Sequence, residues 1–222
     1  MVGTAQAQSA GVSRLWLSRL AAQGLLERVA QGVYRDAGAP SDRFDRLRIA
    51  FVETGPRVAA GERVRQPVPD AVVSGAAATY LHGVGALVPE PYEFTVPRRR
   101  KTRRDGIVLR VRRLAPEDVT RREGLPVTTV ERTMADLVEA WTDLSLVRQV
   151  ARDAANVDRG RIAELLAPFA ARHGLPRGDG AGMWAKLERL AGRDPQTVAA
   201  AIADGPLGPL VAARLGRAPV TT

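Results

Sequence analysis

The sequence predicts an α+β protein: an N-terminal winged helix-turn-helix, then a mixed α/β domain, then a helical C-terminal part. Two helical segments flank a glycine at position 11, and a short hairpin pattern follows them before residue 36. Strand-like alternation appears at 92–96 and 107–112, whereas the last third carries apolar residues at spacings of three and four. We therefore expect a DNA-binding domain over 1–36, an α/β domain over 42–141 and a helical region over 142–222.

The helix-turn-helix is predicted from Ala7 and Gly11, which stand four residues apart. Two helices that cross closely need a small side chain, and the tight turn needs a residue that tolerates positive φ. Ser13 is a natural N-cap for the next helix, and Leu17 and Leu20 fall on one of its faces. We expect this recognition helix to contact base edges and phosphates through Ser13, Arg14, Trp16, Ser18 and Arg19.

A wing is predicted directly after this helix. Gly24 ends the helix, and strand-like residues on either side of Ala30-Gln31-Gly32 indicate a tight hairpin. The expected phosphate contacts of the wing are Arg28, Gln31 and Arg35. A complete winged helix has a further helix before the turn motif, and only three residues precede Thr4. We expect that first helix to be missing here or to be supplied from elsewhere.

The positive charge of the chain is concentrated in one segment. The formal net charge is +9, and residues 97–113 contain nine basic residues and one acidic residue. Such a patch can bind polyphosphate or an acidic protein surface, with strong salt dependence. Its centre consists of Arg98, Arg99, Arg100, Lys101, Arg103 and Arg104.

The centre of this basic segment, residues 98–104, lies between the strand candidates 92–96 and 107–112, and Asp105-Gly106 is a turn signal. The pattern predicts a basic β-hairpin with Ile107, Leu109 and Val111 facing inward. Its partly mobile tip would bind nucleic acid or a partner, or would serve only as a solvated surface.

Other segments have clear local signals. Residues 37–41 form a small-residue linker, residues 42–54 an amphipathic helix, and residues 55–70 mostly loop. Ser74 is expected to cap a short helix, and Thr128 with Glu131 has the spacing of a capping box. In the last third, helices are predicted over 144–156, 161–172, 181–190, 195–203 and 207–215.

Composition excludes several classes of protein. The absence of cysteine rules out disulfide scaffolds, cysteine-ligated zinc and thiol catalysis, and it fits a reducing cytoplasm. Neither a signal peptide nor a membrane-spanning apolar run is recognisable, so we expect a cytoplasmic protein with no membrane partner.

No catalytic residue, cofactor or metal site is predicted. His82 and His173 lie far apart and lack metal-ligand spacing, and no nucleophile elbow surrounds Ser74. Ser74 is better explained as a cap and His82 as a helix-end residue bound to a backbone group. Arg132 and Asp136, four residues apart, have the spacing of a helical ion pair.

Taken in order, several motifs resemble the AbiEi-like antitoxins of bacteria, especially the actinobacterial ones. The matching residues are 10–14, 26–35, 73–78, 81–83 and 124–137. The resemblance implies a winged helix that represses its own operon and a C-terminal part that neutralises a nucleotidyltransferase-type toxin encoded beside it. It also implies a protein that is not an enzyme.

Our hypothesis is therefore that the protein is a DNA-binding autorepressor and antitoxin. Its partners would be the operator DNA of its own operon, the cognate nucleotidyltransferase-like toxin or its product, and a second copy in a homodimer that fixes half-site spacing. Two alternatives remain open: a protein-interaction module that binds no DNA alone, and a nucleic-acid-processing enzyme. The Asp…Glu-x-Lys pattern of an endonuclease is not found in the last third.

Overall fold

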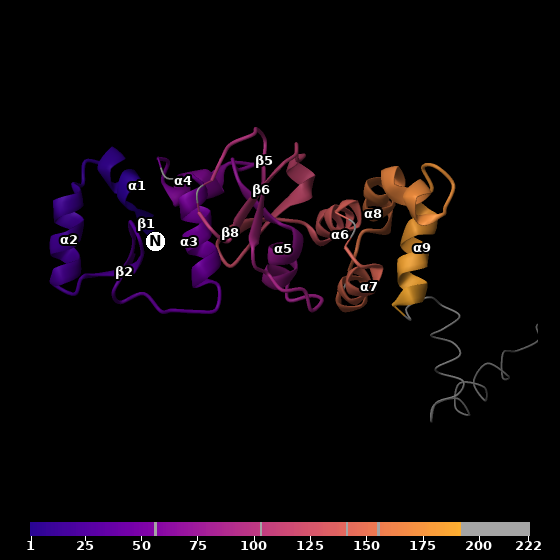
Figure 1. The fold of residues 1–222 in the computed structure, drawn as a ribbon, viewed down its shortest axis with the longest axis horizontal. Helices are drawn as coiled ribbons and strands as arrows, with labels where there is room; N and C mark the ends of the chain where they lie inside the picture. Colours follow the sequence, from indigo (N-terminus) through magenta and orange to yellow (C-terminus); the bar gives the residue numbers. More distant parts are fainter. Residues whose placement is uncertain (56, 103, 141, 155, 192–222) are drawn as a thin grey trace, which may run out of the picture. The chain divides into compact units, whose positions relative to one another are not determined.

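The computed structural model describes residues 1–55, 57–102, 104–140, 142–154 and 156–191 (Figure 1). The chain divides into two compact units, Met1–Leu137 and Val138–Thr222. The described residues form helices together with one three-stranded and one five-stranded sheet. The prediction of a mixed α/β fold is therefore confirmed.

The first 36 residues contain two helices and the three-stranded sheet. The elements are β1 (Val2–Gly3), α1 (Thr4–Ser9), α2 (Arg14–Ala22), β2 (Leu26–Ala30) and β3 (Val33–Asp36). The strands pair antiparallel in the order β1-β3-β2. Gly32 has a φ of +76° in the connection between β2 and β3, so the predicted hairpin is confirmed.

Helix α3 (Asp45–Thr54) joins this small sheet to the rest of the first unit. A Cβ atom added at Gly3 in β1 would lie 3.2 Å from Cγ1 of Val52, which shows how closely α3 packs on β1. In addition, Nε2 of Gln6 in α1 donates a hydrogen bond of 3.3 Å to the carbonyl oxygen of Gly55. The helix that covers β1 therefore comes from later in the sequence.

The five-stranded sheet forms the centre of the first unit. Its strands are β4 (Val72–Ser74), β5 (Tyr92–Val96), β6 (Ile107–Val111), β7 (Val119–Arg122) and β8 (Leu125–Thr128), in the order β6-β5-β4-β8-β7. The remaining elements are α4 (Ala60–Arg65), α5 (Gly75–His82), the 3₁₀ helix η1 (Pro116–Asp118) and α6 (Val130–Glu139). Side chains of α3 and α5, such as Phe51 and Ala78, share a buried cluster with Val73, Phe94 and Val127 of the sheet.

The predicted basic β-hairpin is wrong, because β5 and β6 run parallel. Tyr92 pairs with Ile107 and Val96 pairs with Val111, so the chain must return along the sheet between the two strands. The connection over 97–106 makes this return. Gly106 does adopt a φ of +80°, but it leads into a strand parallel to the previous one. Ile107 is buried as expected, whereas Val111 is 57% exposed.

Three local predictions also need correction. The segment expected to be mostly loop contains α4. Ser74 precedes α5 as expected, but its hydroxyl makes no capping hydrogen bond. Thr129 takes the capping position expected of Thr128, because its hydroxyl accepts from the backbone amide of Arg132 at 3.3 Å.

The second unit is helical over its described residues. It contains α7 (Leu144–Asp153), α8 (Arg159–Leu166), the 3₁₀ helix η2 (Ala167–His173) and α9 (Gly180–Leu190). The three helices predicted before residue 191 are thus confirmed with shifted ends, and those predicted over 195–203 and 207–215 lie outside the described residues. Among the described helices, none combines the length and the apolar character needed to cross a bilayer.

Candidate nucleic-acid interface

Helix α2 is held at both ends by the residues that the sequence singled out. The Ser13 hydroxyl accepts a hydrogen bond of 3.2 Å from the backbone amide of Trp16, which confirms the N-cap. Gly11 has a φ of +83° in the turn before the helix, and Gly24 has a φ of +74° after it. Gly11 therefore sets the direction of α2 relative to α1, and Gly24 sets the direction in which the chain leaves α2 towards β2.

The two faces of α2 differ in chemistry. Leu17 is 3% exposed and packs with Ala7 of α1 and Tyr34 of β3. The predicted contact residues Ser13, Arg14, Trp16, Ser18 and Arg19 are all exposed. The Arg19 guanidinium lies 5.7 Å from the centroid of the Trp16 ring. The structure thus gathers the predicted residues of α2 on one accessible helix.

The predicted contacts of the wing divide into two groups. Arg28 and Gln31 are exposed. The side chain of Arg35 is only 11% exposed, because it forms ion pairs with Glu27 of β2 and Asp45 of α3. Two carboxylates neutralise this guanidinium, so Arg35 stabilises the junction between the hairpin and α3 and is unsuited to contact phosphate.

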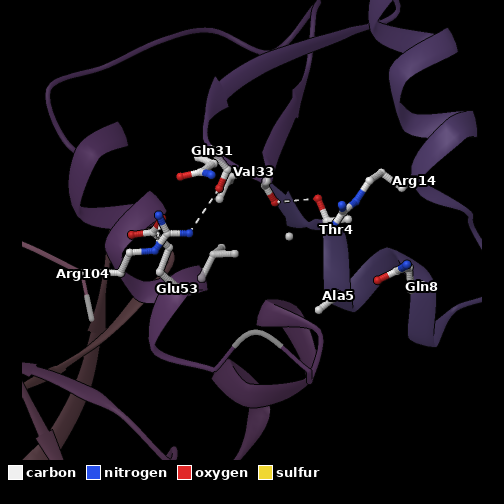
Figure 2. Close-up of a pocket in the computed structure, with 11 residues that line it drawn as sticks. Thr4, Ala5, Gln8, Arg14, Gln31, Val33, Glu53 and Arg104 are labelled. Atoms are coloured by element: carbon white, nitrogen blue, oxygen red, sulfur yellow. Dashed lines mark hydrogen bonds and ion pairs between the residues drawn. The ribbon is translucent and has the colours of Figure 1, made fainter. Parts of the chain in front are cut away.

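A pocket of about 470 Å³ opens beside the hairpin of β2 and β3 (Figure 2). Arg14 reaches into it from α2, Thr4 and Gln8 from α1, and Gln31 from the hairpin loop. Arg104 closes another side, where its Nη2 donates a hydrogen bond of 3.3 Å to the carbonyl oxygen of Gln31. The predicted wing and the basic segment therefore meet in one place, although 73 residues separate them in the sequence.

Glu53 of α3 also lines this pocket. Its Oε1 lies 3.2 Å from Nε of Arg104, and its side chain is 14% exposed. Burial raises the pKa of Glu53, and the charge of Arg104 offsets part of that rise. Arg104 therefore stabilises the ionised carboxylate while it holds the basic segment against the hairpin.

The basic segment is anchored at two points. Arg100 donates hydrogen bonds of 3.0 Å to Oδ2 and to the carbonyl oxygen of Asp70, and Arg104 contacts Glu53 and Gln31. Arg98, Arg99 and Lys101 are exposed, whereas Arg103 lies outside the described residues. The segment is thus a crossover held at Arg100 and Arg104, and not the tip of a hairpin. Arg98 and Arg99 are exposed before the first of these anchors, and Lys101 is exposed after it.

Asp70 connects this segment to the interior. Its Oδ1 accepts a hydrogen bond of 2.6 Å from Nε of Arg63, a guanidinium that is 1% exposed. Arg63 also donates to the carbonyl oxygen of Phe51 and to the Thr54 hydroxyl, each at 2.8 Å. Burial raises the pKa of Asp70, but Arg63 and Arg100 outweigh that effect and hold this pKa below its ordinary value.

Sequence reasoning missed several of these residues. Arg57 lies in the segment expected to be loop, and it lines a second pocket of about 790 Å³ together with Arg100, Lys101 and Arg104. Thr4, Gln8 and Glu53 were not singled out either. Because their role depends on contacts between distant segments, no spacing in the sequence marks them.

His82 and the pair Arg132–Asp136 make the contacts that the sequence predicts. Nε2 of His82 lies 2.7 Å from the carbonyl oxygen of Thr128, so the prediction that a backbone group satisfies His82 is confirmed. Burial lowers the pKa of His82, which favours the neutral ring. The predicted ion pair between Arg132 and Asp136 is present at 2.8 Å.

Across the described parts of the chain, no group of three or more histidine, aspartate or glutamate residues is placed to hold a metal ion.

Residues 1–35 match the sequence model of a family described as a transcriptional regulator, AbiEi antitoxin. The resemblance predicted from the sequence is thus confirmed over this segment. The chain gave no match among curated proteins. Among solved structures it is similar to the RV2827C protein from Mycobacterium tuberculosis, with a TM-score of 0.44 and 16% sequence identity over 88% of this chain and 72% of that chain.

Proposed function

We propose that the protein is a DNA-binding transcriptional autorepressor and antitoxin that counters a nucleotidyltransferase-type toxin or its product. Residues 1–36 form its winged helix-turn-helix, in which α2 is the recognition helix and β2 and β3 are the wing. The observation that carries the proposal is the exposed face of α2, which presents Arg14, Ser18 and Arg19 within the segment that matches the regulator family. Such side chains bind base edges and phosphates in a major groove.

The helix that a winged helix normally has before its turn motif is supplied by α3. Support comes from the close packing of Val52 on Gly3 and from the hydrogen bond between Gln6 and the carbonyl oxygen of Gly55. The ion pair between Arg35 and Asp45 adds a third link between the hairpin and α3. DNA binding therefore depends on residues up to about the end of α3, and not on the first 36 alone.

The basic crossover provides a second set of phosphate contacts beside the wing. Arg104 ties the crossover to the hairpin loop, and Arg98, Arg99 and Lys101 stay exposed. These cations contribute affinity for DNA of any base sequence, whereas the recognition helix selects the base sequence. The same cations also suit the acidic surface of a toxin, which is the alternative assignment.

DNase I footprinting on the DNA upstream of its own gene tests the proposed function. We expect a protected segment of discrete length that resists competition by shuffled DNA. A matched Arg152→Ala variant, changed at an exposed arginine of α7, should give the same footprint. If no segment is protected at any concentration, the protein does not act as an autorepressor of that operon.

A protein-interaction module is the second candidate, because Leu15 and Trp16 are 60% and 56% exposed. Large exposed apolar side chains often mark interaction surfaces. A toxin complex that survives nuclease treatment and is lost in a Trp16→Ala variant would favour this candidate.

A further inference from the structure

Leu15 occupies an unusual position for a large apolar side chain. It is 60% exposed, whereas Leu17, two residues later on the same helix, is 3% exposed. Successive residues of an α-helix are about 100° apart around its axis. The side of α2 that faces the small core carries Leu17, Leu20 and Ala21. Leu15 points nearly opposite to the mean direction of these three residues around the helix axis. Leu15 therefore stands in the middle of the outward face.

The neighbours of Leu15 show which chemical groups of a base edge the outward face of α2 can bind. Ser18, Arg19 and Ala22 are exposed beside it, and α2 contains no acidic residue, asparagine or glutamine. The face therefore lacks the amide side chains that bind adenine in a bidentate manner and the carboxylates that accept from cytosine. What it presents is an apolar surface next to guanidinium groups.

In the major groove, the apolar group of a base edge is the 5-methyl group of thymine. We propose that Leu15 reads a thymine methyl group in the operator and is a specificity-determining residue of α2. This inference rests on the proposed function and adds to it one specific contact with a base. Arg19 lies beside the leucine on this face and Arg14 precedes it in the sequence, and their charges favour a polyanion over an apolar protein surface.

Replacing thymine by deoxyuridine removes this methyl group and leaves Watson–Crick pairing intact. In the footprinted segment, each thymine is replaced in turn, and the affinity of the full chain is measured by fluorescence anisotropy. We expect at least one replacement to weaken binding of the wild-type protein about fourfold, the effect of one buried methyl group. Leu15→Ala should bind the thymine and deoxyuridine forms at that position equally.

Leu25→Ala is the matched control. Leu25 is a leucine of nearly equal exposure, 57%, but it follows the end of α2 at Ala22. This variant should keep the full discrimination between thymine and deoxyuridine, and far-ultraviolet circular dichroism should show that all three proteins are equally folded.

The outcomes separate the inference from the proposed function. If the wild-type protein binds its operator specifically but is indifferent to every deoxyuridine replacement, the thymine contact is wrong and the repressor function stands. If Leu15→Ala changes the oligomeric mass and leaves the discrimination intact, Leu15 contacts protein, and the inference is overturned. If the protein does not prefer its upstream DNA to shuffled DNA, both the inference and the proposed function fail.

Discussion

Asp70 accepts a hydrogen bond of 2.6 Å from the buried guanidinium of Arg63. The same carboxylate binds Arg100 of the basic crossover at 3.0 Å. One acidic residue therefore links an interior cation to the surface that we assign to phosphate binding. Removal of a partner from such a pair leaves an uncompensated buried charge, which is more costly than the loss of a surface pair.

Asp70→Asn is accordingly expected to lower the free energy of unfolding by about 2 kcal/mol, less than for a fully buried pair because Asp70 is 39% exposed. Urea denaturation followed by circular dichroism measures this change. The control is Arg46→Gln, which breaks an exposed pair with Glu90 and should alter stability by less than about 0.5 kcal/mol. Equal effects of both substitutions would contradict a structural role for the Arg63–Asp70 pair.

The half-buried ring of His82 predicts a dependence of stability on pH. Burial holds its pKa below 6.5 in the folded protein, so the unfolded chain binds the proton first as the pH falls. The free energy of unfolding should therefore decline as the pH drops through about 6.5 and level off below the folded pKa. Unfolding in urea from about pH 7.5 to about pH 5 measures this slope.

His82→Gln should show a smaller decline over that range. The decline that remains belongs partly to His173, whose pKa is also lowered, first by burial and then by Lys186 and Arg172. An unchanged slope in His82→Gln would mean that the ring is not buried in its neutral form.

Arg98→Ala combined with Arg99→Ala tests the basic crossover. We expect affinity to fall equally for operator and shuffled DNA, because phosphate contacts carry no sequence information. The slope of log K against log salt should become shallower by about 1.8, the contribution of two phosphate contacts. Arg152→Ala should leave the slope unchanged, and an unaltered slope in the double variant would exclude these arginines from the interface.

Substitution of Gly180 by alanine tests the packing of the second unit. A Cβ atom at this position would collide with the backbone of Ala163 and Ala167, so Gly180→Ala should destabilise this unit by about 3 kcal/mol. Gly160→Ala is the control, because its Cβ would only reach 3.4 Å from an Asp158 side-chain oxygen. Protease resistance of residues 142–191 should be lost in the first variant and kept in the second.

Short-range features of the fold could be predicted from the sequence. The turn at Gly11, the cap at Ser13 and the hairpin at Gly32 each depend on one or two residues whose backbone preference is strong. The ion pair between Arg132 and Asp136 likewise follows from helical spacing. These predictions succeeded because the deciding interactions lie within a few residues.

Long-range features could not be predicted in the same way. Asp105-Gly106 indicates a turn but does not fix whether the next strand runs parallel or antiparallel, and the sheet as a whole decides this. The partners that anchor the basic crossover, Asp70 and Glu53, are distant in the sequence. Arg63 was missed because a buried guanidinium is unexpected in a segment rich in proline and glycine.

The central claim is that α2 reads an operator sequence. It is tested most directly by fluorescence anisotropy of the wild-type protein and Arg14→Ala on upstream and shuffled DNA at several salt concentrations. We predict that the wild-type protein prefers the upstream DNA by about a thousandfold or more, and that Arg14→Ala reduces this preference about tenfold. Equal affinity of the wild-type protein for both DNAs at every salt concentration would contradict the claim.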